Sequence, residues 1–290
     1  MCRVLGVSRS GYYGWLAREQ GPPAGRAAQD LELLGQIKQV HAAFSYYGSP
    51  RIHQHLLIQS GQAAQTRQTA PVGERGRRLG RRRVARLMRC NGIRARRGKI
   101  KSRPRAAPPA RRPEITDKVR RHFGGHEPDE VWFTDITQIR TNQGWLYAAV
   151  VLDSFNREVI SWATASQDTI NTALTALREA IRVRRPRPGT VIHSDRGYQF
   201  TSAAWLDLAA RNGLQVSIGE RKSCYDNAVM ESWFSSFKAE ALYPFGPPDT
   251  TDAGRTRLFR YIWQYNNHRL HSTLGYVSPT YYAQYASICP

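Results

Sequence analysis

The chain has 290 residues, and its 43 Lys and Arg against 22 Asp and Glu give a formal net charge of +21. Because 41% of the residues are hydrophobic, the chain can bury a core, which excludes wholesale disorder. It has no apolar run near the roughly 18 residues of a membrane span, no signal-peptide segment among its first residues and no paired cysteine spacing, so we expect a reduced, cytoplasmic protein with no membrane partner.

The excess positive charge lies in the N-terminal part of the chain. Residues 1–125 carry 27 basic and 6 acidic residues, whereas residues 126–290 carry 16 of each. The segment Arg75–Arg105 has 15 basic residues and no acidic one. A solvated protein face usually mixes both signs, and a block of one sign needs a polyanion to offset its self-repulsion. The distribution therefore favours nucleic acid over a bare solvated face or a membrane surface.

The first part of the chain, residues 1–97, is predicted to be helical because apolar residues recur there at helical spacing. Residues 61–80 interrupt this pattern, since they are rich in Gln, Gly and Arg and lack periodicity. Four prolines in Lys101–Pro113 indicate an extended linker, which we place at 98–122. The predicted elements are a turn between two short helices at Val7–Tyr13 and helices over Leu31–Ala43, Arg51–Ser60 and Leu79–Cys90.

From residue 131 the pattern changes to apolar, branched and aromatic runs, with a hairpin signal at Thr141–Gly144. Three strands, a helix, a strand, a helix, a strand and a helix follow one another, which predicts an α/β sheet whose first three strands form a meander. The strands are predicted over Val131–Ile139, Trp145–Leu152, Glu158–Ala165, Thr190–His193 and Leu214–Ile218. The helices are one capped by Asp168 and ended by Pro186, and two over Thr201–Asn212 and Asn227–Leu242.

Three acidic residues stand out by their settings. Asp135 lies inside an apolar strand, Asp195 follows the fourth strand, and Glu231 lies early on the last of these helices. A buried carboxylate is costly unless a cation or hydrogen bonds stabilise it, so each acid alone is best explained by bonds to backbone or to an Arg. Together they can converge from separate elements, as the oxygen ligands of a Mg²⁺ pair do in phosphodiester displacement.

The last of these helices supports a nucleic-acid role. Its apolar stripe leaves Glu231 and Lys238 on an adjacent face, about 10 Å apart along the axis. One end of that face could hold metal and the other a DNA phosphate, although Lys238 alone would be read as a solvent lysine. The competing acids are weaker candidates, because Asp153 suits a turn and Asp226 and Asn227 suit a helix N-cap.

These residues resemble the OrfB-type transposases of bacterial insertion sequences, within the DDE and retroviral-integrase superfamily. The separations of 59 residues between Asp135 and Asp195 and of 35 between Asp195 and Glu231 match the pattern of that branch. The likeness covers nearly all of 123–285. Its motifs there are Trp132–Thr137, His193–Ser202, Ser223–Ala228 with Glu231–Phe234 and Lys238–Glu240, Tyr265–Ser272 and Leu274–Pro279. Further family-like pieces are Cys2–Tyr13, Tyr47–Ile52 and Arg82–Met88.

The resemblance implies a ribonuclease-H-like mixed five-stranded sheet flanked by helices (about 130–242), a C-terminal extension over 243–285, and a basic, helix-turn-helix-like region in 1–97. It implies DNA strand cleavage and joining with two Mg²⁺ or Mn²⁺ ions per active site. It carries the catalytic and metal-binding roles onto Asp135, Asp195 and Glu231. The DNA contacts that we expect are Lys238, Arg82, Arg83, Arg86 and Arg89.

Residues 61–80 depart from the family, which usually passes quickly between the two helices that they separate. They are either an insertion or, as we hypothesise, a local frame error. The family also joins an upstream-frame subunit by frameshifting and acts as a multimer on paired ends, so we expect a homo-multimer and that subunit or fusion as partners. A defective remnant that only binds DNA and a general metal-dependent nuclease are the alternatives.

Overall fold

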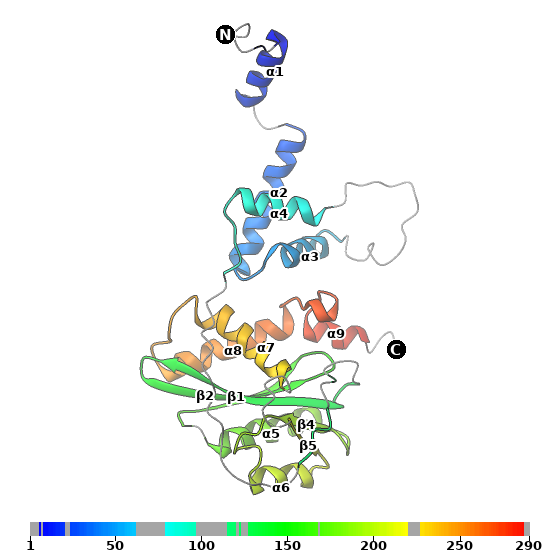
Figure 1. Ribbon diagram of the computed structural model, residues 1–290, viewed down its shortest axis with the longest axis vertical. Helices are drawn as coiled ribbons and strands as arrows, with labels where there is room; N and C mark the ends of the chain where they lie inside the picture. The colour runs from blue at the N-terminus through cyan, green and yellow to red at the C-terminus, as the bar shows by residue number, and fades with distance from the viewer. Residues whose placement is uncertain are drawn as a thin grey trace. The chain divides into compact units, whose positions relative to one another are not determined.

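The structure is a computed structural model that describes residues 6, 8–20, 24–61, 79–96, 115–119, 122, 127–167, 169–219 and 227–286. The chain forms two compact units, Met1–Arg96 and Arg97–Pro290, which we describe one at a time (Figure 1). Within the described ranges, no helix is both long and apolar enough to cross a lipid bilayer.

The first unit is helical, with α1 (Arg9–Gln20), α2 (Arg26–Ala43), α3 (Ser49–Gln59) and α4 (Arg81–Cys90). Helices α2, α3 and α4 pack on one another through their apolar stripes, which confirms the three helices expected there. The turn predicted at Val7–Tyr13 is wrong from Arg9 onward, where α1 runs, but Ser8, one of the two caps expected there, does accept a hydrogen bond from Gly11 N at 3.0 Å. The stripes consist of Leu33, Ile37 and Val40, of Ile52, Leu56 and Leu57, and of Val84, Leu87 and Met88.

Polar contacts from two residues, Asp30 and His53, fix α4 within this unit. Asp30 on α2 pairs with Arg83, at 2.6 Å, and with Arg86. His53 on α3 lies with Nε2 2.7 Å from the carbonyl oxygen of Leu79, just before α4. The described residues on either side of 62–78 are thus bonded to one another, and α3 packs on α4 across that break in the description.

The described part of the second unit contains a five-stranded sheet in the order β3-β2-β1-β4-β5. Strands β1, β2 and β3 form the expected antiparallel meander, whereas β4 runs parallel to both β1 and β5. The sheet is therefore mixed, as predicted. The strands are β1 (Val131–Thr141), β2 (Gly144–Asp153), β3 (Val159–Ala165), β4 (Val191–Ser194) and β5 (Gln215–Ile218).

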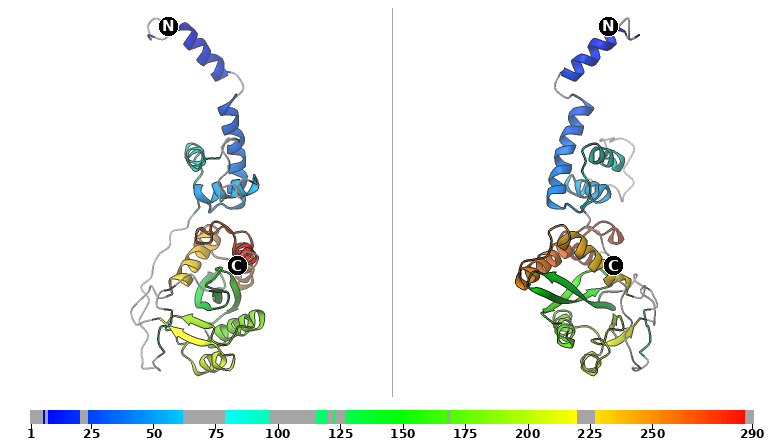
Figure 2. Two further views of the ribbon diagram at one scale, coloured as in Figure 1. Left: turned by 90° about the vertical axis from the view of Figure 1, so that its right-hand side faces the viewer. Right: turned by 60° about the vertical axis from the view of Figure 1, so that its left-hand side comes forward.

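Helices cover both faces of the sheet (Figures 1 and 2). Helices α5 (Ile170–Arg184) and α6 (Ala203–Arg211) lie on one face, and α7 (Ala228–Phe237) and α8 (Thr251–Asn267) lie on the other. Because side chains alternate along a strand, Trp132 packs in the core between the sheet and α5 and α6, and Phe133 packs in the core between the sheet and α7 and α8. The helix-start residue predicted at Asp168 lies outside the described residues.

The end of this unit differs from the sequence prediction. The helix expected to run regularly to Leu242 ends as α7 at Phe237 and continues as one π-helical turn, η2 (Lys238–Leu242). Helix α8, the short turn η3 (Ser272–Leu274) and α9 (Pro279–Ala286) follow, in the range for which the resemblance implies only a C-terminal extension. Part of the predicted linker is also packed. Val119 is buried in the core that includes α7 and α8, and Lys118 N donates a hydrogen bond to Ser217 Oγ at 2.9 Å.

Candidate active site

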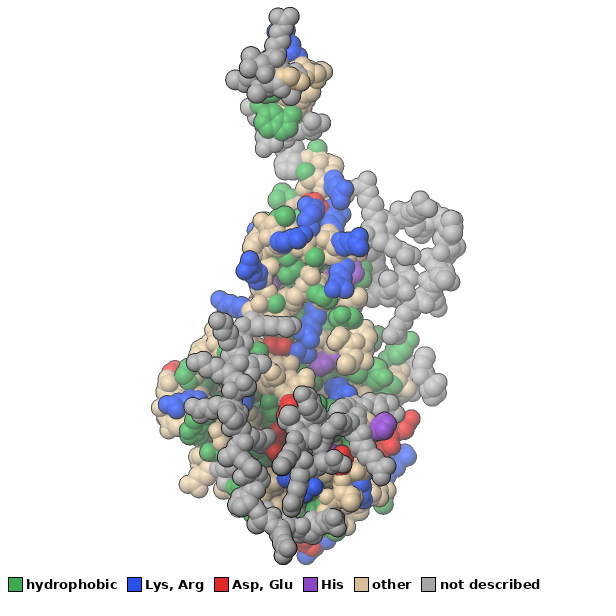
Figure 3. Space-filling view, viewed as in Figure 1, with side chains coloured by type: hydrophobic (Ala, Val, Ile, Leu, Met, Phe, Trp, Pro, Cys, Tyr) green, Lys and Arg blue, Asp and Glu red, His purple; other side chains and the backbone are tan. Residues whose placement is uncertain are grey.

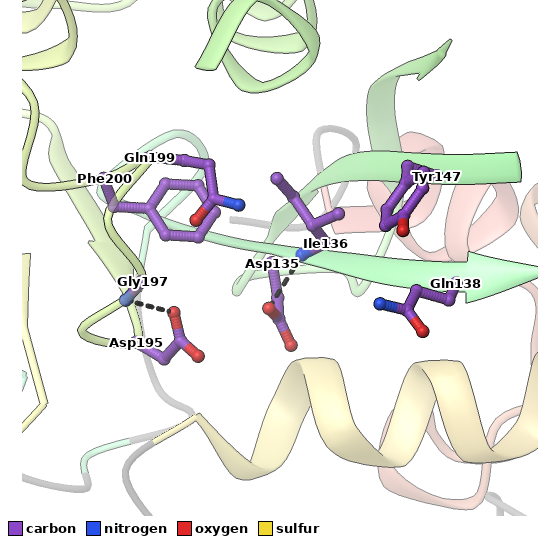
Figure 4. A pocket seen from close by; sticks show the side chains of 8 residues that line it. All are labelled: Asp135, Ile136, Gln138, Tyr147, Asp195, Gly197, Gln199 and Phe200. Atoms are coloured by element: carbon purple, nitrogen blue, oxygen red, sulfur yellow. Dashed lines mark hydrogen bonds between the residues drawn. The ribbon is translucent and has the colours of Figure 1, made fainter. Parts of the chain in front are cut away.

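The register of the two central parallel strands brings Asp135 and Asp195 together. The pairing of β1 with β4 ends at Phe133 and His193, and each aspartate lies two residues beyond this last pair. Equal offsets along parallel strands leave the two side chains abreast, at the point where β1 runs on and β4 stops. Both carboxylates line one pocket of about 90 Å³ (Figure 4). The other lining residues are Ile136, Gln138, Tyr147, Gly197, Gln199 and Phe200.

Backbone N–H groups orient both carboxylates. Asp135 is 6% exposed, and its Oδ1 accepts a hydrogen bond from Ile136 N at 2.7 Å. Asp195 Oδ1 accepts one from Gly197 N at 2.9 Å. A Cβ at residue 197 would lie 3.0 Å from that oxygen and 2.8 Å from Gln199 Oε1, so a larger residue there would displace these two side chains. The carboxylates are therefore held in place before any ligand binds.

Glu231 occupies the first turn of α7 and is exposed. The start of α7 is fixed beside Asp135, because Asn227 donates from Nδ2 to the carbonyl oxygen of Thr134 at 3.1 Å. Glu231 does not line the pocket, and nowhere in the described ranges do three His, Cys, Asp or Glu side chains gather closely enough to hold a metal ion. The structure thus brings two of the three predicted acids together and leaves the third on the adjacent helix.

The donor set of the pocket suits a divalent cation. Mg²⁺ and Mn²⁺ prefer carboxylate and other oxygen ligands, and two carboxylates from separate strands meet here. Asp135 and Asp195 are the residues that would hold such an ion. Lys238 lies at the end of α7, partly buried and seven residues from Glu231, and its carbonyl oxygen accepts the π-type hydrogen bond from Tyr243 N at 2.8 Å.

Of the competing acids, Asp153 has a structural role. Asp153 is fully buried at the end of β2, and its two oxygens accept hydrogen bonds from Phe155 N at 3.0 Å and Asp129 N at 3.3 Å. This is the turn expected from the sequence. Burial raises the pKa of Asp153 to about 6. Asp226 lies outside the described residues, and the Asn227 side chain bonds β1 instead of capping its own helix.

The four arginines predicted to contact DNA divide into two pairs. Arg82 and Arg89 are exposed on α4, whereas Arg83 and Arg86 bond Asp30, and these hydrogen bonds lower the pKa of that carboxyl. Figure 3 shows Lys and Arg side chains gathered over the helices of the first unit on the face in view. Arg82 and Arg89 are thus the more accessible pair, whereas Arg83 and Arg86 are engaged by Asp30 and the Arg86 side chain is 43% exposed.

Sequence reasoning missed two residues that line the pocket. Gln138 on β1 and Tyr147 on β2 are direct cross-strand partners, and both reach the space beside Asp135 (Figure 4). They lie outside the motifs of the resemblance. Each carries a polar group on a strand of the central sheet, and this signal identifies a candidate only once the strand register places the two residues opposite each other.

Comparisons with known proteins identify families that match most of the chain. Residues 125–224 and 212–279 match two families described as integrase core domain, and residues 28–101 match a family described as HTH-like domain. Among solved structures, the HTLV-2 integrase catalytic core domain in complex with magnesium resembles the chain at 17% identity and a TM-score of 0.40, over 50% of this chain and 91% of that one.

Two relatives extend over nearly the whole chain. An uncharacterized 31 kDa protein of the insertion element IS600 from Shigella sonnei is 33% identical over 283 residues, which are 96% of each chain. Transposase InsF for insertion sequence IS3A from Escherichia coli strain K12 is 33% identical over 295 residues, which are 96% of this chain and 91% of the relative. The chain belongs to the OrfB-type insertion-sequence transposases of the DDE and integrase superfamily.

Proposed function

We propose that the chain catalyses the metal-dependent DNA strand cleavage and strand transfer that move a bacterial insertion sequence. The observation that carries this proposal is the pocket in which Asp135 and Asp195 meet, within a chain of transposase ancestry. Water attacks a phosphodiester at the element end in the first step. The released 3′-hydroxyl then attacks a target phosphodiester, and a 3′-oxygen leaves in each step.

The three acids and Lys238 have different tasks in this scheme. Asp135 and Asp195, fixed by backbone N–H groups, would hold divalent cations, and Glu231 in the first turn of α7 would supply the third carboxylate. A pair of Mg²⁺ or Mn²⁺ ions supplies activation of the attacking oxygen and stabilisation of the leaving oxygen. Lys238, two turns along from Glu231, contacts a phosphate of the element end.

The helical unit supplies DNA affinity. Arg82 and Arg89, exposed on α4, are the direct phosphate contacts, and Arg83 and Arg86 hold that helix against α2 through Asp30. Joining two ends to one target requires two active sites, so the working form is a multimer on paired ends, with the upstream-frame subunit or fusion as a further partner. The protein acts in the bacterial cytoplasm, at the nucleoid when it is bound to DNA.

The defective-remnant alternative gains no support from the described residues. Both aspartates line the pocket, and α3 still packs on α4 on either side of residues 62–78. Those residues lie outside the described ranges, so the frame-error hypothesis stays a prediction that reading the other two frames of the coding DNA would test. A short, family-like connection in either frame would support it.

Strand joining tests the function. The reaction contains the protein, Mg²⁺ and DNA with the element's own ends, and it is repeated with the upstream-frame fusion if the chain alone forms no product. We expect Asp195→Asn and Glu231→Gln to bind DNA and to lose joining. Asp207→Asn, an exposed acid on α6, is the control and should join normally. Unchanged joining by Glu231→Gln would remove Glu231 from the site, and loss by the control would show that the assay reports folding.

A further inference from the structure

A buried ion pair joins the C-terminal extension to the helix that carries Glu231 and Lys238. Arg269, which follows α8, is 4% exposed. Its guanidinium donates from Nη2 to Glu240 Oε1 at 2.6 Å and from Nε to Glu240 Oε2 at 2.9 Å. Glu240 lies in the middle of η2, and Tyr261 donates a further hydrogen bond to its Oε2 at 3.2 Å.

The remaining contacts of Arg269 complete its surroundings. Nη2 also lies 3.4 Å from Ser236 Oγ on α7, and Nη1 lies 3.3 Å from His271 Nε2. The guanidinium lies over the Tyr265 ring, 5.6 Å from its centroid. A buried ion pair adds little stability over an apolar pair of similar size, because desolvation offsets the attraction. The bidentate hydrogen bonding between Arg269 and Glu240 does fix the position of the groups that it joins.

The groups fixed in this way flank Lys238. Ser236 and Glu240 are four residues apart and lie on one side of the helix, and Lys238, midway between them, lies on the opposite side. Lys238 is also the first residue of the π-turn, whose hydrogen bond runs from Tyr243 N to the carbonyl oxygen of Lys238. Such turns are rare and mostly found as single turns inside α-helices, frequently at functional sites. Glu231, seven residues earlier, lies on the same side as Lys238.

We propose that Arg269 is a positioning residue, which holds Ser236 and Glu240, stabilises the π-turn at Lys238 and thereby sets the direction from which Lys238 approaches the DNA end. The inference rests on the DNA contact that the proposed function gives to Lys238. The motif that contains Arg269 and His271 thus contributes to the recognition of element ends by positioning Lys238, without itself contacting DNA.

The test is a mutant cycle between Arg269 and Lys238 in the full chain. Arg269→Lys keeps the positive charge and removes the bidentate hydrogen bonding. The double variant Arg269→Met with Glu240→Leu replaces the ion pair by apolar side chains of similar size. Arg255→Lys on α8 is the control, because Arg255 bonds Thr164 and Asp252. The measurements are the Kd for element-end DNA against random DNA of equal length, KM and kcat for joining, and Tm.

We expect Arg269→Lys and the apolar double variant to weaken end binding about tenfold, with KM raised more than kcat is lowered. Tm and binding to random DNA should stay near the values of the control. In a Lys238→Ala background, Arg269→Lys should cause no further loss, because it acts through Lys238. If the losses caused by the two substitutions add fully, the inference about Arg269 is overturned, and the DNA contact of Lys238 is not. Unchanged end binding by Lys238→Ala would overturn both the inference and the DNA contact on which it rests.

Discussion

The buried carboxylate of Asp153 makes the stability of the catalytic unit depend on pH. Burial is the main cause that raises its pKa from an ordinary 3.8 to about 6, and Asp129 adds to it, while hydrogen bonds from Phe155 N and Asp129 N and the charge of Arg184 act in the opposite direction. An acid whose pKa is higher in the folded state stabilises the fold below its unfolded pKa, and this contribution is lost as the pH rises through the folded value. The loss therefore falls between about pH 4 and pH 6.

The magnitude follows from the pKa difference. At about 1.4 kcal/mol for each pH unit, ionised Asp153 lowers the free energy of unfolding by about 3 kcal/mol at pH 7.5 relative to the protonated form. Asp153→Asn removes that charge and keeps one oxygen for Phe155 N, but it loses the second acceptor, which we value at about 1 kcal/mol. The variant should then be about 2 kcal/mol more stable than the parent at pH 7.5, and nearly as stable at pH 4.

Urea unfolding at several pH values between 4 and 7.5 measures this difference. Tryptophan fluorescence is a suitable probe, because every Trp except Trp15 lies in the unit Arg97–Pro290. Asp207→Asn serves as the control, since Asp207 is 55% exposed and pairs only at the surface with Arg211. A stability difference between Asp153→Asn and the parent that does not change with pH, or a variant less stable than the parent at pH 7.5, would refute the reasoning.

Three further outcomes are expected. A Cβ at Gly254 would lie 3.1 Å from Leu146 Cδ2, so Gly254→Ala should lower the free energy of unfolding by about 1 kcal/mol. A Cβ at Gly35 on α2 would meet open space, so Gly35→Ala should raise that free energy by about 0.5–1 kcal/mol. Urea unfolding measures both changes. Asn266→Ala removes two hydrogen bonds to the Val159 backbone and should cost about 2 kcal/mol in the same assay, against less than about 0.5 kcal/mol for Asn267→Ala. DNA affinity should fall steeply with salt and less steeply for Arg82→Ala, and a salt slope unchanged by that substitution would remove Arg82 from the contacts.

The sheet and most helices could be predicted to within a few residues because their causes are local. Strands β1 and β2 are apolar runs joined by a hairpin turn, and the stripes of α2 and α3 repeat at helical spacing. The cause of α8 is equally local, since Leu258, Tyr261, Ile262 and Tyr265 recur at helical spacing.

Features that depend on distant partners could not be predicted. The π-turn at η2 involves Glu240 and an arginine 29 residues later in the chain, and no local pattern reports that contact. The division of the α4 arginines depends on Asp30, which is 53 residues from Arg83. The sequence shows a row of basic residues, and only the packing of α2 on α4 decides which of them remain accessible to DNA.

The candidate site shows the same limit one step further on. An acid inside an apolar strand is costly without a partner, which singles out Asp135, and Asp195 is singled out by its place directly after a short buried strand. The two aspartates lie side by side because β1 and β4 pair in parallel. The sequence predicts a meander of the first three strands, and that prediction does not fix how β4 pairs with β1. The position of the Glu231 carboxylate depends in addition on how α7 begins, and the contact of Asn227 with Thr134 that places this start was not anticipated.

His193 explains why the motif around Asp195 extends beyond the acid itself. It is fully buried on β4, with Nδ1 2.9 Å from Ser217 Oγ on β5 and 3.8 Å from Asp117 Oδ1. Lys118 N donates to the same Ser217 hydroxyl, so β5 and residues 117–118 are joined at one point of β4, two residues before Asp195. Strand β4 has only four residues, and a strand so short needs such contacts to keep its register with β1. Because a shift of one residue would turn Asp195 to the other face of the sheet, the contacts of His193 contribute to the site by fixing the strand.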